Sequence, residues 1–428
     1  MTRSPRGYSL VELLIAITVA FVIIAGAISL LNGQMRSFQT GTQDRALQEA
    51  ARIALSEISG NLRRAGYGID PAVAFDFGDQ AAARMEASPA NFTFAVTGAN
   101  CNPALAVCRD RIDGPDELSF VTRDTIFGPH VVTQAYAGGT ISISGPLKQP
   151  LRAGQLLQIM CYSGSYRWAY VTLAAEVPAT TADEVTLTLV NGGTGFPNQT
   201  GVLADACFST VATVDGALTT YPKVTTASFD ASAKVFKVDR YHYFIRNYTD
   251  LGVSVDWGTA GSRPFLMLEQ GLVGPDGGLI ESVIAPDVED LQLAYVFPLA
   301  TANRMVGNVA NTPITGDAAG VDLAATAPIF GDPDPTVDTP VTNKSNHHPG
   351  NIRAVQVSIL VRSPTPDIAI AGDDLPALGN RAATVNPGDN FKRLTVQTTV
   401  PVTNLAAEVP YYPTYDITGA TALNAGGG

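Results

Sequence analysis

Charge, cysteine and histidine are all scarce in this chain. Its 428 residues include 39 acidic and 27 basic side chains, four cysteines and four histidines. No lysine- or arginine-rich run offsets the formal net charge of −12. A protein with this acidic balance is a poor partner for nucleic acid or for anionic phospholipid headgroups, so we expect neither.

Catalytic motifs are also missing. The sequence contains no nucleophile elbow, phosphate-binding loop, HExxH helix or paired-carboxylate motif in a credible setting. A zinc site is disfavoured because there is no CxxC pair and the histidines are scattered. We therefore expect no enzyme activity and no cofactor.

One acidic loop is a weak candidate for calcium. Asp332, Asp334 and Asp338 alternate with proline and threonine, and carboxylates in a loop are suitable calcium ligands. The spacing is not that of an EF-hand, and a solvated acidic loop is the competing interpretation.

Aromatic and basic residues meet in one strand-like segment. Tyr241, Tyr243 and Phe244 lie between Arg240 and Arg246 in the sequence. They form either a ligand-facing patch or, as we favour, ordinary sheet side chains with packing and cation–π contacts.

Formal charge is absent from the 19 residues Leu13 to Leu31, and proline is absent from Tyr8 to Gly66. The uncharged run is long enough to span a bilayer as a helix. Without proline the helix continues, so we predict one helix of about 55–58 residues, about 85 Å long. Gly66 and Gly68 supply the stop signal.

The second half of this helix is amphipathic. Apolar side chains recur at helical spacing, whereas Gln43, Asp44, Gln48, Arg52 and Asn61 lie largely off that stripe. The stripe consists of Leu47, Ala51, Ala54, Leu55, Ile58, Leu62 and Ala65. Glycines between Gly26 and Gly41 permit either local melting or, as we favour, a continuous helix.

The leader before the apolar run is not an ordinary secretory signal. Its small residue, Gly7, precedes the apolar stretch and directly follows the basic residues Arg3 and Arg6. Cutting there would remove the charges and keep the helix. The sequence Gly7-Tyr8-Ser-Leu-Val-Glu12 resembles the class III signal of type IV prepilins and type II secretion pseudopilins, with Tyr8 where phenylalanine is usual.

The resemblance implies a processing and assembly route. A prepilin peptidase would cut after Gly7 and Tyr8 would be N-methylated. Glu12 would pair with the terminal ammonium of a neighbouring subunit and set the register of assembly. Its cost in lipid is several kcal/mol unless it is paired. The implied partners are other minor and major pilins and the inner-membrane assembly platform.

The leader charges also predict topology. Arg3 and Arg6 keep the N-terminus in the cytoplasm, so the chain after Leu31 is exported. We expect a single-pass protein of the bacterial inner membrane, with a periplasmic globular domain, that later reaches the pilus or cell surface.

The end of the helix narrows the resemblance. The segment Arg64-Ala-Gly-Tyr67 looks like the PilW group of minor pilins, which is related to the J-type pseudopilins of type II secretion. This resemblance implies a minor pilin at or near the pilus tip that acts in assembly or initiation. The alternatives are a minor pseudopilin, or a tip adhesin or ligand-binding module.

The four cysteines are even in number and belong to an exported chain, which favours disulfides. Three pairings are possible. We expect Cys101 with Cys108, which close a short loop, and Cys161 with Cys207, which both adjoin strand-like segments.

Downstream of Gly68 the chain predicts an antiparallel β-rich domain, and the fold class is therefore α+β. Ten segments have strand composition, with the clearest period-2 alternation in the last three. They are 118–122, 131–136, 140–144, 155–160, 167–172, 185–191, 235–246, 290–297, 352–362 and 392–400.

The expected organisation follows this order along the chain. It comprises a leader (1–7), a membrane or filament-core helix half (8–31), an amphipathic half (32–67), a disulfide-containing β-rich region (69–230), a C-terminal sheet region (231–404) with a long insertion (298–350), and a tail (405–428).

Overall fold

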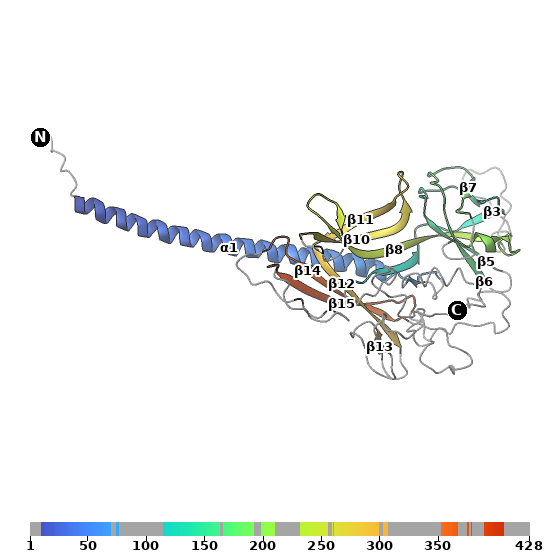
Figure 1. The fold of residues 1–428 in the computed structure, drawn as a ribbon. Coiled ribbons are helices and arrows are strands. Elements are labelled where there is room, and N and C mark those ends of the chain that lie inside the picture. The colour runs from blue at the N-terminus through green and yellow to red at the C-terminus, as the bar shows by residue number, and fades with distance from the viewer. Residues whose placement is uncertain are drawn as a thin grey trace.

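A computed structural model shows one long N-terminal helix followed by a large antiparallel β domain (Figure 1). The expected α+β class is thereby confirmed. The structure describes residues 10–69, 74–76, 114–162, 166–191, 198–209, 232–255, 259, 261–298, 303–306, 352–366, 375, 378 and 389–405.

Helix α1 runs without a break from Leu10 to Leu62, so the continuous alternative is the one observed. It ends in a turn where Gly66 has φ +74° and donates its N–H to the Val121 carbonyl at 2.9 Å. A Cβ at Gly66 would lie 2.6 Å from Leu405 Cδ2. Gly66 is therefore required by both its backbone angle and its close packing.

One face of the second half of α1 is buried against the β domain. The predicted positions Leu47, Ala54, Ile58 and Leu62 are all nearly inaccessible to solvent. Gln43, which we placed off the stripe, is also buried, and this expectation was wrong. Its Nε2 donates to the Thr365 carbonyl at 3.4 Å and to the Thr365 hydroxyl at 3.3 Å, which gives the buried amide donor a partner.

A four-stranded antiparallel sheet packs beneath this face in the order β13-β12-β14-β15. Its strands are β12 (Val288–Pro298), β13 (Asn303–Val306), β14 (Ala354–Arg362) and β15 (Arg393–Pro401). Strand β13 lies inside the stretch 298–350, which we predicted as a long insertion and in which none of the ten predicted strands falls.

A second, larger sheet is organised by β8 (Lys234–Tyr248), whose 15 residues pair with five other strands. Near the helix its neighbours are β2 (Leu118–Arg123), β9 (Ser254–Val255) and β10 (Arg263–Val273). Strand β1 (Phe75–Asp76) extends the sheet beyond β2, and β11 (Leu279–Pro286) extends it beyond β10.

The far half of β8 belongs to a closed ring of strands. The ring contains β3 (His130–Ala137), β4 (Thr140–Ser144), β5 (Leu156–Tyr162), β6 (Tyr166–Thr172) and β7 (Glu184–Thr188). Pairing runs β8-β3-β4-β7 on one side and β8-β5-β6 on the other. Bonds from Val190 N–H to the Thr172 carbonyl and from Ala174 N–H to the Thr188 carbonyl close it. Among the strands that the structure describes, closure leaves no free sheet edge in this distal barrel.

Among the described residues, two large hydrophobic cores follow from this division of β8, and a smaller third cluster contains Val121, Tyr170 and Val238. The first lies between α1, the four-stranded sheet and the near half of β8, with Tyr243 and Leu268 among its members. The second fills the distal barrel and includes Val235 from the far half of β8. The barrel is carried at the end of the molecule away from the N-terminus (Figure 1).

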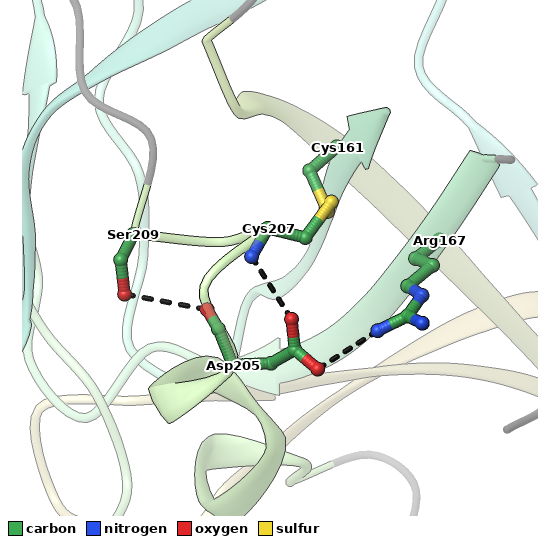
Figure 2. The surroundings of a disulfide bond; sticks show 5 residues. All are labelled: Cys161, Arg167, Asp205, Cys207 and Ser209. Carbon is green, nitrogen blue, oxygen red and sulfur yellow. Dashed lines mark hydrogen bonds and ion pairs between the residues drawn. A yellow bond between two sulfur atoms is a disulfide. The ribbon is translucent and has the colours of Figure 1, made fainter. Parts of the chain in front are cut away.

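A disulfide joins Cys161, near the end of β5, to Cys207, which follows the 3-10 helix η4 (Thr200–Ala204). This is the pairing expected for these two cysteines. Figure 2 shows Asp205 beside it, accepting hydrogen bonds from the Cys207 N–H at 2.9 Å and from Arg167 Nη1 at 2.8 Å. Cys101 and Cys108 lie outside the described residues.

All ten predicted strands are present, but the β10–β11 hairpin was not predicted. Strand β10 carries a continuous apolar run at 265–268, and in β11 the polar pair Glu281 and Ser282 divides two apolar runs, so neither segment alternates. The predicted tail also begins too early, because Leu405 is buried in the core against Gly66.

The helix packing predicts a strong effect of truncation at Ile58, which is completely buried. Ile58→Ala should lower the free energy of unfolding by about 2–5 kcal/mol, because it leaves a cavity beneath α1. Ile53→Ala, on an exposed part of the same helix, is the matched control and should change it by less than about 1 kcal/mol. Denaturant unfolding of the mature chain in detergent measures both, and equal losses would contradict this packing.

The disulfide predicts a second stability effect. Its 46-residue separation gives a loop-closure contribution of about 4 kcal/mol, so a Cys161→Ser, Cys207→Ser double variant should unfold at lower denaturant. Because the bond lies within the barrel core, the loss should appear first as faster hydrogen exchange in β5 and β6. Unchanged exchange there would show that the bond is dispensable for the barrel.

Candidate functional site: the N-terminal helix

The N-terminal part of α1 projects away from the β domain (Figure 1). Every described residue from Leu10 to Gln39 is exposed, and Gln43 is the first buried one. Leu10 and Val22 expose 78% and 72% of their surface, which is costly for large apolar side chains in water. This part of the helix is therefore suited to lipid or to other apolar helices.

The apolar length matches a membrane. Within the described residues, α1 is one helix that is long and apolar enough to cross a bilayer. From Leu10 to Leu31 it is about 33 Å long, close to the thickness of a hydrocarbon core. The hydroxyl of Thr18 donates to the Ile15 carbonyl at 2.8 Å, so this polar group is satisfied within the helix.

An exposed polar segment separates the membrane half from the β domain. Residues 32–42 contribute about 16 Å of helix before the first buried side chain. The first buried side chain of α1 therefore lies about 16 Å along the helix from the end of its apolar half.

Glu12 lies in the first turn of the described helix, where a carboxylate interacts favourably with the helix dipole. It is on the exposed, apolar half of α1. Gly7 and Tyr8 lie outside the described residues, as do Asp332, Asp334 and Asp338.

Polar contacts fasten the other end of α1 to the domain. Asn61 Nδ2 donates to the Tyr243 hydroxyl at 2.8 Å, and Arg64 Nη2 donates to the Tyr241 hydroxyl at 3.0 Å. Burial raises the pKa of Tyr243, which keeps its hydroxyl protonated. Asn404 Nδ2 donates to the Arg63 and Ala65 carbonyls, which the helix itself leaves without partners.

These contacts decide the role of the aromatic segment. Tyr241 and Tyr243 lie in the core under α1, where they stack with Phe120. Phe244 alternates to the opposite face of β8, where Arg246 lies 4.9 Å above its ring. The structure supports the packing interpretation, since the three rings do not form one surface.

Among the residues that the structure describes, no group of three or more His, Cys, Asp or Glu side chains is placed to hold a metal ion. The site supported by the geometry is therefore an apolar, exposed helix with an acid near its start.

Residues 2–28 match the prokaryotic N-terminal methylation motif. The chain carries a prepilin-type signal. This match supports a type IV pilin-like or pseudopilin-like protein that is processed by a prepilin peptidase, and it is consistent with membrane anchoring by α1. No curated protein and no solved structure matches the chain.

The signal predicts a defined mature N-terminus. Intact-mass and N-terminal peptide spectra of the protein from a strain with prepilin peptidase should show a chain that begins with N-methylated Tyr8. In a Gly7→Val variant the leader should remain, because a side chain then stands at the cleavage position. A mature chain that starts elsewhere would contradict the assignment of Gly7 and Tyr8.

Proposed function

We propose that the chain is a minor pilin of the PilW kind, incorporated at or near the tip of a type IV pilus, where it acts in pilus assembly or initiation. The main support is the prepilin-type signal on a helix whose exposed apolar half projects from a large β domain. The activity is assembly rather than catalysis.

In this proposal Glu12 sets the register in which the helix of one subunit packs against the helix of its neighbour. A carboxylate and an ammonium that each cost several kcal/mol in an apolar environment cost less as a pair. The methylated terminal amine of a neighbouring subunit is the ammonium that approaches Glu12 as the helix leaves the membrane. Apolar side chains around Glu12 then exchange lipid contacts for contacts with other helices.

The size of the β domain supports a position at the tip. After α1 the described residues form two large cores, and the distal barrel lies beyond the end of the helix that packs on the first core. Removal of Arg3 and Arg6 with the leader leaves 25 basic against 39 acidic residues, a formal charge of −14. If every subunit of a pilus shaft carried this bulky, acidic domain, neighbouring domains would repel one another. A few copies at one end of the pilus would avoid that repulsion.

A minor pseudopilin of a type II secretion system is the alternative, because the N-terminal signal is common to both classes. Deletion of the gene distinguishes them. Loss of surface pili with normal protein secretion supports the pilus assignment, and loss of secretion with normal pili supports the pseudopilin.

Glu12→Ala should separate membrane insertion from assembly. The variant should reach the membrane fraction at the wild-type level, since it removes a charge from the apolar half. Its incorporation into sheared pili should fall at least tenfold, because the partner ammonium is left unpaired. Quantitative immunoblots of membrane and pilus fractions measure both.

Glu49→Ala is the matched control, since Glu49 is an exposed acid on the aqueous half of the same helix. It should assemble like the wild type. If the Glu12→Ala variant were incorporated into pili as well as the wild type, the Glu12 carboxylate would not have the role that we assign to it.

A further inference from the structure

Three arginines follow one line along the side of α1 that faces away from the β domain. Arg45 and Arg52 belong to the helix, Arg63 directly follows it, and all three are exposed. The Arg63 N–H donates to the Ser59 carbonyl at 3.3 Å, so Arg63 continues the helical path. Separations of 7 and 11 residues are about two and three turns, which places the three on one side. Ala54, about two and a half turns from Arg45 and from Arg63, is completely buried on the opposite side.

This arginine line (Arg45, Arg52 and Arg63) is long and accessible. It extends over about 27 Å of helix, because 18 residues separate its ends. Between Arg52 and Arg63 the outward positions are Ser56 and Gly60, which are both small and exposed. Nothing lies within 4 Å of the position that a Cβ on Gly60 would occupy. A flat partner surface can therefore reach the guanidinium groups along the whole line.

The charges of the arginine line are not used within the subunit. In the part of the chain that the structure describes, none of the three guanidinium groups forms an ion pair or a hydrogen bond. The nearby acids of α1 are engaged elsewhere, since Asp44 forms an ion pair with Lys392 and Glu57 accepts a hydrogen bond from Asn61 Nδ2 at 2.8 Å. Glu49 is the exposed acid beside the line. The line therefore carries three positive charges beside one carboxylate.

The rest of the chain has the opposite charge. From Tyr67 to Gly428 the sequence contains 35 acidic and 20 basic residues, a formal charge of −15. Against this acidic background the arginine line is a local positive surface, and such a surface attracts and orients acidic partners.

The same side of α1 continues into the apolar half. Phe38 and Leu31 precede Arg45 by 7 and 14 residues, about two and four turns, and expose 74% and 54% of their surface. Phe38 lies in the polar segment 32–42, where a large apolar side chain in water is costly. A second helix that packs along Leu31 and Phe38 would bring the polar part of its own subunit beside the arginine line.

The direction of the line favours a protein over a lipid surface or a nucleic acid. The line runs along the helix axis, from about 21 Å to about 48 Å beyond Leu31. A bilayer surface crosses the helix, so lipid headgroups would leave Arg52 and Arg63 without partners. The acidic charge of the whole chain repels a nucleic acid, whereas a protein needs only a local acidic surface to fit.

We propose that the arginine line binds an acidic surface of a neighbouring, different pilin-type subunit whose apolar helix packs along Leu31 and Phe38. This inference rests on the proposed function, because it names the partner surface in an assembly of pilin-type helices. Asp and Glu side chains of the partner pair with guanidinium groups that are about 10.5 Å and about 16.5 Å apart along the helix. The apolar half supplies contact area, and the arginine line selects the partner and fixes its orientation.

The test compares charge variants of the full chain in cells that assemble pili. A triple variant, Arg45→Glu, Arg52→Glu and Arg63→Glu, should reach the membrane fraction at the wild-type level. Its incorporation into sheared pili should fall by about tenfold or more, because each ion pair becomes a contact between like charges. The matched control replaces the same three residues with lysine, keeps the charge, and should retain most of the incorporation.

A photo-cross-linking residue at Ser56, in the middle of the arginine line, identifies the partner. In the wild-type background it should join the chain to a different pilin-type subunit, identified by mass spectrometry of the product. The triple glutamate variant should lose this product and the triple lysine variant should keep it.

The outcomes separate this inference from the proposed function. If the glutamate variant enters pili and forms the cross-link like the wild type, the arginine line has no role in binding, while the assignment as a pilin stands. If the wild-type chain is absent from pili, the proposed function fails, and the cross-link at Ser56 tests the line independently. Loss of the glutamate variant from the membrane fraction, or a cross-link to a second copy or to nucleic acid, would overturn the proposed partner.

Discussion

The packing of the second half of α1 on the core beneath it is the interaction on which the rest of the structure depends. Ala50, Ala51 and Ala54 bring the helix backbone close to the β domain, and Ile58 and Leu62 fill the space beyond them. Because this end is fixed by both packing and hydrogen bonds, the other end can remain outside the domain. A helix with apolar side chains on all faces of its exposed half then needs lipid or another helix as its environment.

This arrangement separates two tasks along one helix. The apolar half with Glu12 is suited to membrane insertion and, in our proposal, to assembly, whereas the amphipathic half carries the β domain. The exposed segment 32–42 keeps the tasks apart in space. Strand β8 repeats this division within the domain, since its near half supports α1 and its far half completes the distal barrel.

Much of this could be predicted from periodicity. The helical stripe from Leu47 to Ala65 is the buried face of α1, and the alternating apolar residues of β12 and β14 are the ones that lie in the core beneath it. Gln43 was misplaced because its burial depends on Thr365, a partner distant in sequence. Strand β10 lacks alternation since both of its faces are buried, as the successive residues Leu266, Met267 and Leu268 show. Barrel closure depends on pairing between β6 and β7 ends, which composition does not encode.

In our proposal the prepilin-type signal directs the helix into the filament, and the β domain is the part displayed at the cell surface. The most direct test of the account is immunogold labelling of intact and sheared pili with antibodies against the distal barrel. We expect label at one end of the filaments, lost together with pili when the gene is deleted. Label confined to the membrane fraction, or distributed along filament shafts, would contradict a minor pilin at the tip.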